Sequence, residues 1–161
     1  MTVSKPKSTG KNLTEPPVSV FFNASVILAG IKSPKGASGI LLKFGASGDL
    51  QAYASVLVIQ EVFRHTGKLG LTTRQTLKTI QATFPLNQIA PLPTKRHVDL
   101  WIGQVKDPGD AHVLAACQTT TAHYLVTLDK KHLLSLAHAV KPFQIVSPSK
   151  LLGQIHLYRT L

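Results

Sequence analysis

Short apolar runs recur along most of the chain, separated by segments in which apolar residues follow a helical spacing. The clearest runs are VSVFF at 18–22 and HYLVTL at 123–128, and shorter runs of the same kind are QAYA at 51–54 and FQIVS at 143–147. Continuous apolar runs are typical of strands buried on both faces of a parallel sheet. We therefore expect four strands over these ranges, and an edge strand within 86–93, where prolines exclude a central position.

Helices are expected between these strands. Ser55 is suited to cap the helix that follows it, and Ser147 and Pro148 are typical of a helix start. The segment 72–84 is amphipathic, with Leu77, Ile80 and Phe84 on one side. Further helices are expected over 24–31, 37–44, 94–105, 108–120 and 130–140. Strands that alternate with helices predict an α/β fold with a parallel sheet covered on both faces.

Composition narrows the class of protein. The 161 residues suggest one domain, from residue 17 to about 158, after a polar tail at 1–16 that we expect to be flexible. Lys and Arg total 18 against 7 acidic residues, a net charge of +11 that favours a polyanionic partner, RNA or DNA, or else an acidic protein. Cys117 is the only cysteine, so the chain holds no internal disulfide, which fits a reducing cytoplasm. No run approaches the ~20 apolar residues that span a bilayer.

Three of the few acidic residues lie in or beside apolar elements. Glu61 lies within VLVIQEVF, Asp110 opens DAHVLAAC, and Asp129 directly follows HYLVTL, while Asn23 directly follows VSVFF. Ligands of parallel α/β sheets bind beyond the carboxyl ends of the strands. We therefore expect Asn23, Asp110 and Asp129 to share one rim, which Glu61 joins if its helix leans over it.

Carboxylates gathered from separate elements are suited to bind Mg²⁺ or Mn²⁺, because hard cations prefer oxygen ligands. Each residue also has a simpler interpretation. Asp110 is placed to cap a helix, Asp129 to form a turn, and Glu61 to pair with Arg64 or His65 on an exposed helix face.

The same segments resemble a known family. NASVILAGIKSPKGAS, the helix that carries Glu61, KDPGDAHVLAAC, AHYLVTLDKKHLL and IVSPSKLL are similar to the PIN domain, and within it to toxins of toxin–antitoxin systems related to VapC-type ribonucleases. The resemblance covers about residues 18 to 153. It implies a three-layer α/β/α sandwich around a central parallel sheet of four or five strands, and a ribonuclease that uses Mg²⁺ or Mn²⁺.

The resemblance also implies roles for individual residues. The four acidic positions of the family fall on Asn23, Glu61, Asp110 and Asp129, which are thus the expected catalytic and metal-binding residues. Supporting roles fall on Ser25, Thr127 and Asp107, and we expect RNA contacts from Lys32, Lys35, Lys130 and Lys131. The expected partners are RNA, an antitoxin protein and a second copy of the chain.

Asn23 departs from the family pattern, which has an acid at this position. An amide offers a metal one neutral oxygen, and its NH₂ group repels cations. The alternative to an enzyme is therefore a PIN domain with a weakened or inactive site that binds RNA or a partner. The seven histidines show no pair with the i, i+4 spacing of a zinc site and a third ligand. We thus expect His112, His123 and His132, which bracket the acidic motifs, to be structural or surface residues.

Overall fold

The computed structural model describes residues 17–160, and the side chains of residues 17–155. The expected tail at 1–16 lies outside the described residues. Five strands form one parallel sheet in the order β3-β2-β1-β4-β5. The strands are β1 (Val18–Phe22), β2 (Leu50–Ser55), β3 (Ile89–Ala90), β4 (Tyr124–Val126) and β5 (Gln144–Val146). The four expected strands and the edge strand are confirmed, and β1 is the central strand.

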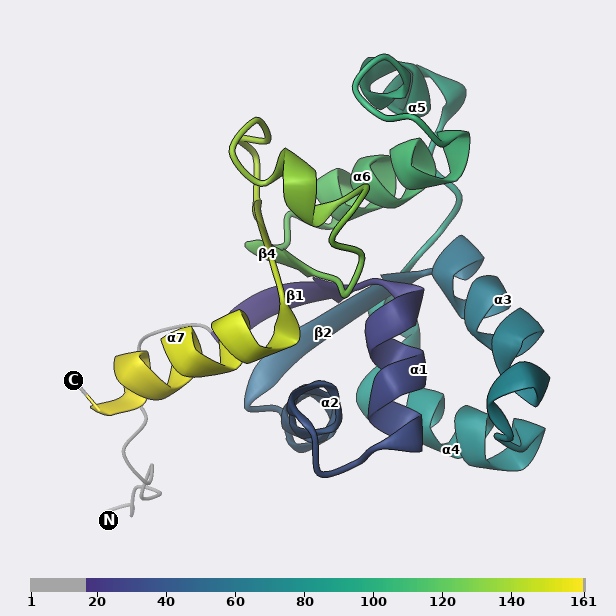
Figure 1. Cartoon of the computed structure of the whole chain (residues 1–161), viewed down its shortest axis with the longest axis vertical. Coiled ribbons are helices and arrows are strands. Elements are labelled where there is room, and N and C mark those ends of the chain that lie inside the picture. The colour runs from purple at the N-terminus through teal and green to yellow at the C-terminus, as the bar shows by residue number, and fades with distance from the viewer. Residues whose placement is uncertain (1–16, 161) are drawn as a thin grey trace, which may run out of the picture.

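Helices cover both faces of the sheet, which confirms the three-layer α/β/α architecture. In Figure 1, α5 and α6 lie on one side of β1 and β2, and α1, α2 and α7 lie on the other. The α-helices are α1 (Ala24–Lys32), α2 (Ala37–Ser47), α3 (Val56–His65), α4 (Thr73–Thr83), α5 (Lys95–Ile102), α6 (Pro108–Thr120) and α7 (Pro148–Thr160). Three short 3₁₀ helices are η1 (Gly67–Leu69), η2 (Leu86–Gln88) and η3 (Leu134–Leu136).

Polar side chains start these helices where the sequence predicts. The Ser55 hydroxyl accepts a hydrogen bond from the backbone N–H of Val58, and the Ser147 hydroxyl accepts one from Lys150. Each cap satisfies a backbone donor that the first helical turn leaves unpaired. Helices α3 and α7 therefore begin directly after the carboxyl ends of β2 and β5.

The core lies on both sides of the central strand. Val20, Phe21 and Phe22 of β1 are fully buried, as expected for a strand with helices on both faces. Phe22 meets Phe84 edge to face, with ring centroids 5.5 Å apart, which packs β1 against the end of α4. Because β1 is held on every side, the residue that follows it, Asn23, has a fixed position.

Two local predictions are wrong. Residues 130–140 do not form an α-helix: they form turns around the short 3₁₀ helix Leu134–Leu136. Leu77 does not share a buried side with Ile80 and Phe84, because it is 44% exposed and Thr76 is buried in its place. A hydroxyl can pack at this position because the Thr76 side chain donates to the backbone carbonyl of Thr72 and so needs no water.

None of the helices in the described part of the chain is long and apolar enough to cross a membrane.

Candidate metal centre

The rim at the carboxyl ends of β1 and β4 brings Asn23 and Thr127 together. These strands are neighbours, and the Asn23 backbone N–H donates to the Val126 carbonyl over 3.0 Å. The Asn23 side-chain Nδ2 donates to Thr127 Oγ1 over 2.8 Å. Its Oδ1 accepts from the Ala24 N–H over 2.9 Å and so caps α1. Both polar ends of the buried amide therefore already have partners within the chain.

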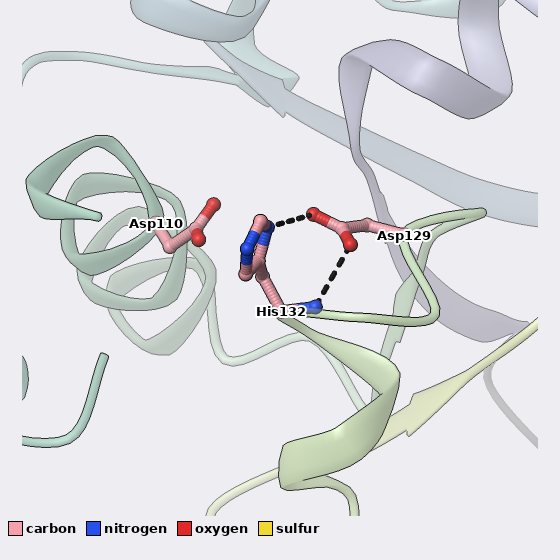
Figure 2. Close-up of side chains that lie close together, drawn as sticks. All are labelled: Asp110, Asp129 and His132. Carbon is pink, nitrogen blue, oxygen red and sulfur yellow. Dashed lines mark hydrogen bonds and ion pairs between the residues drawn. The ribbon is translucent and has the colours of Figure 1, made fainter. Parts of the chain in front are cut away.

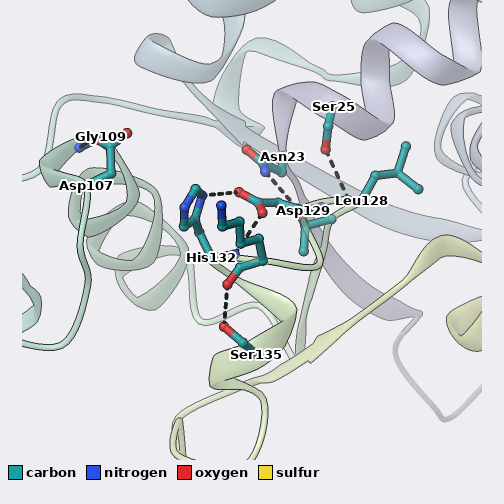
Figure 3. Close-up of polar contacts among 10 residues, drawn as sticks. Asn23, Ser25, Asp107, Gly109, Leu128, Asp129, His132 and Ser135 are labelled. Carbon is teal, nitrogen blue, oxygen red and sulfur yellow. Dashed lines mark hydrogen bonds and ion pairs between the residues drawn. The ribbon is translucent and has the colours of Figure 1, made fainter.

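Ser25 and Thr127 hold the loop that leads to Asp129. The Ser25 hydroxyl accepts from the backbone N–H of Leu128 over 3.1 Å, and the Thr127 hydroxyl accepts from the N–H of Asp129 over 3.1 Å. Figure 3 shows this loop beside the start of α1, with the bond from Ser25 to Leu128. The two hydroxyls thus position the backbone of this loop.

Asp129 turns the chain so that His132 comes back towards it. Asp129 Oδ1 accepts from the His132 backbone N–H over 2.9 Å, and Asp129 Oδ2 lies 3.5 Å from His132 Nδ1. Both side chains are partly open, with exposed fractions of 29% for Asp129 and 39% for His132. Solutes can therefore reach this pair.

Asp110 approaches from the opposite side, in the first turn of α6. The helix cap is Asp107, whose Oδ1 accepts from the Gly109 N–H over 2.8 Å, so the capping role considered for Asp110 belongs to its neighbour. Asp110 Oδ2 is buried and has no hydrogen-bond partner among the described residues. A buried carboxylate oxygen without a donor is costly unless a cation or proton joins it.

The electrostatic surroundings of Asp110 are consistent with this cost. Burial raises the pKa of the Asp110 carboxyl, and the charges of Asp107, Asp129 and Glu61 raise it further, while His132 lowers it. Carboxylates that raise one another's pKa are stabilised by a shared cation.

Asp110, Asp129 and His132 form a group that fits a metal ion. Each offers one ligand atom, and these atoms all lie within 4.8 Å of one another. In Figure 2 the imidazole ring of His132 lies between the two carboxylates. Ligands bonded to one ion at about 2.1 Å lie up to roughly 4 Å apart, so small side-chain movements bring all three onto one ion. The unpaired Asp110 Oδ2 and this donor set both fit a divalent cation.

The other predicted residues lie at varying distances from this group. Glu61 is exposed on α3 and lies outside the three-residue group, although its charge acts on Asp110. Lys130 and Lys131 directly follow Asp129, and Lys131 is exposed. Lys32, by contrast, ends α1, about 13 Å of helix away from Asn23, and exposed Lys35 follows it.

His132 is the member of the group that the sequence analysis missed. We expected it to be structural because no histidine pair with zinc spacing exists. The signal lies instead in its relation to an acid, since His132 follows Asp129 by three residues. In the turn after a strand, that spacing brings the two side chains together.

Comparison with known proteins decides the family. The sequence profile of the PIN domain matches residues 19–131, which include Asn23, Glu61, Asp110 and Asp129. The chain belongs to the PIN domain family. A comparison with curated protein sequences gives no match.

Two crystal structures share the fold of this PIN domain. PAE2754 from Pyrobaculum aerophilum superposes with a TM-score of 0.61 at 17% identity, over 92% of this chain and 98% of the other. VapBC2 from Rickettsia felis, bound to a DNA fragment from its promoter, gives 0.51 at 11% identity, over 80% of this chain and 97% of the other. The likeness extends over almost the full length of both structures, so the PIN fold accounts for most of this chain.

Proposed function

We propose that this PIN domain is a nuclease that hydrolyses RNA with the help of a divalent metal ion, Mg²⁺ or Mn²⁺, held by Asp110 and Asp129. Two observations at one residue carry the proposal: Asp110 Oδ2 is buried without a hydrogen-bond partner among the described residues, and the Asp110 carboxylate lies within 4.8 Å of ligand atoms of Asp129 and His132. When bound, such an ion supplies a water of lowered pKa and positive charge for the phosphate oxygens.

The residues of the chain divide the remaining work. Asp110 and Asp129 hold the ion, and Ser25 and Thr127 fix the backbone beside Asp129 through the hydrogen bonds described above. Asp107 caps α6 and so sets the orientation of the turn that carries Asp110. Glu61, which the family pattern places in the site, adds negative charge from α3. Lys130 and Lys131 contact the RNA backbone, and the net charge of +11 favours RNA over the whole surface.

The test compares three proteins. Purified wild type, Asp129→Asn and Asn23→Asp are incubated with structured and unstructured RNA, with Mn²⁺ or Mg²⁺ or with a chelator. Cleavage by the wild type that needs metal and is lost in Asp129→Asn supports the proposal. Equal trace cleavage by all three proteins contradicts it, because a contaminating ribonuclease does not depend on residue 129.

The second candidate is a PIN domain that binds RNA or a partner without cleaving. It is favoured by one observation at Asn23, which stands at the first acidic position of the family pattern. Both ends of its side-chain amide are already hydrogen-bonded, to Thr127 and to Ala24. In the same experiment, cleavage that appears only in Asn23→Asp supports this candidate.

We further propose that the protein is the toxin of a toxin–antitoxin pair in the cytoplasm, and that it forms homodimers. Support comes from the resemblance of its motifs to such toxins and from the fold shared with VapBC2. Co-expression with the product of a small adjacent reading frame tests the pairing, since an antitoxin should co-purify and suppress the growth defect that the domain alone causes.

A further inference from the structure

The donor set of the centre differs from the all-oxygen set that the family pattern implies. At the first acidic position, Asn23 has no carboxylate, and its amide is engaged with Thr127 and Ala24. Its Nδ2 side presents hydrogens, which a cation avoids. The third atom near Asp110 and Asp129 is instead an imidazole nitrogen of His132.

The position of His132 is fixed by its backbone rather than by its ring. Its N–H donates to Asp129 Oδ1, and the carbonyl of Asp129 accepts from the N–H groups of Leu133 and Leu134. These three bonds close the turn whatever side chain stands at residue 132. The ring is thereby placed between the two carboxylates without being needed for the turn itself (Figure 2).

We propose that His132 is a metal ligand of this centre and that it shifts the preference of the site from Mg²⁺ towards first-row transition ions. The inference rests on the proposed function, because it concerns the ion of the same centre. Two carboxylates and one imidazole form a mixed oxygen and nitrogen set.

The chemistry of the ions explains the shift. Mg²⁺ prefers oxygen ligands and releases its water reluctantly, so an imidazole adds little to its binding. First-row ions accept imidazole, and their affinity for nitrogen-containing sites rises from Mn²⁺ to Co²⁺. The site therefore binds Mn²⁺ more tightly than Mg²⁺, and Co²⁺ more tightly than Mn²⁺.

The competing interpretation is that His132 only orients Asp129, through the 3.5 Å contact between Nδ1 and Oδ2. Removal of an orienting partner lowers the affinity for every ion by a similar factor, because every ion binds to Asp129. Removal of a ligand lowers the affinity more for those ions that prefer this ligand. The ratio of affinities for Co²⁺ and Mg²⁺ therefore separates the two roles.

The experiment measures metal binding directly, without RNA. Isothermal titration calorimetry gives the affinities of the full chain for Mg²⁺, Mn²⁺ and Co²⁺, and the visible absorption spectrum of bound Co²⁺ reports its ligands. The variants are His132→Gln, which removes the imidazole nitrogen, and His132→Asp, which puts a carboxylate oxygen in its place. His138→Gln is the matched control, since His138 is a histidine of the same segment outside the three-residue group.

We expect His132→Gln to lower the affinity for Co²⁺ by about tenfold or more and to change the absorption spectrum of bound Co²⁺. The affinity for Mg²⁺ should change by less than about threefold. His132→Asp should lower the ratio of Co²⁺ affinity to Mg²⁺ affinity, because a carboxylate oxygen suits Mg²⁺ better than an imidazole nitrogen does. His138→Gln should match the wild type. Thermal unfolding in chelator verifies that each variant folds. If His132→Gln does not fold, the comparison between the wild type and His132→Asp provides the test.

Two outcomes overturn the inference, and they are distinguishable. If His132→Gln leaves the ratio and the spectrum unchanged while Asp129→Asn abolishes binding, the centre exists without His132, and the proposed function stands. If the wild type binds none of the three ions, the metal centre itself is refuted, and the proposed function falls with it.

Discussion

The side-chain amide of Asn23 donates a hydrogen bond to the hydroxyl of Thr127 over 2.8 Å, although the two residues are 104 positions apart. The bond is buried and joins the ends of β1 and β4 at the rim where Asp129 follows. Thr127 in turn accepts from the backbone of Asp129. The side chains of Asn23 and Thr127 thus link the end of β1 to the backbone of Asp129, which makes Asn23 a structural residue of this rim whether or not it contacts an ion.

This link predicts coupling between the two residues. Asn23→Ala and Thr127→Val each remove the hydrogen bond, so the double variant should lose less stability than the sum of the single losses. The expected coupling is about 1 kcal/mol, the typical contribution of one hydrogen bond. Urea denaturation of the four proteins measures it. Additive losses would mean that the bond contributes nothing and that Asn23 acts only as the cap of α1.

Asp110 should destabilise the metal-free protein. Its carboxylate is partly buried, has an unpaired oxygen and lies near other acids. In chelator, Asp110→Asn should therefore be more stable than the wild type, by up to about 1 kcal/mol, since solvent screens a partly exposed charge. Excess Mn²⁺ should reverse the order, because the variant loses a ligand. Asp99→Asn is the control, as that acid forms an exposed pair with Lys95.

The same comparison has a defined pH dependence. Because the pKa of Asp110 is raised in the folded protein, the folded state keeps this proton to a higher pH than the unfolded state does. The stability that protonation gives is present at low pH and is lost as pH rises through the raised pKa. In chelator, the advantage of Asp110→Asn should therefore be small below about pH 4 and grow above it. If the difference in stability between Asp110→Asn and the wild type shrinks as pH rises, the result contradicts the raised pKa of Asp110.

Most of the rim could be predicted because it follows from the sheet. Apolar runs identify β1 and β4, and parallel strands end at one edge, so Asn23 and Asp129 must lie near each other. The cap of α6 at Asp107 could also be predicted from local spacing. Glu61 could not be placed in this way, because its distance from Asp110 depends on how α3 leans, which is a property of tertiary packing.

The turn after β4 shows why the rest escaped prediction. LLSLAHAV has helical spacing, yet the side chain of Asp129 accepts a hydrogen bond from the backbone N–H of His132. The backbone carbonyl of Asp129 also accepts hydrogen bonds from the N–H groups of Leu133 and Leu134. The competing hydrogen bonds of an Asp side chain favour a turn over a helix. The wrong helix and the missed His132 have one cause, because only this turn returns the histidine to Asp129.

The packing of α1 against α2 should be sensitive at Gly39. A Cβ at this position would collide with the backbone of Pro34, in the turn between the two helices. Gly39→Ala should thus cost about 1–3 kcal/mol, as overpacking does. Gly153, on α7, has nothing within 4 Å of a Cβ, so Gly153→Ala should stabilise by about 0.5–1 kcal/mol. Urea denaturation compares them, and a neutral Gly39→Ala would show that the turn at Pro34 can shift to admit a methyl group.

The position of the lysines predicts which of them guide RNA to the centre. Lys130 and Lys131 follow Asp129 directly, whereas Lys32 is the last residue of α1, at the end away from Asn23, and Lys35 lies just beyond it. Replacing Lys130 and Lys131 by Gln should weaken RNA binding and lower the slope of log affinity against log salt by about 1–2, roughly one for each phosphate that a lysine no longer neutralises. The Lys32 and Lys35 double variant removes the same charge and should change the slope less. Fluorescence anisotropy with single-stranded RNA in chelator measures binding without cleavage. Equal effects in both double variants would indicate that RNA responds to the overall charge of +11, with no path centred on Asp129.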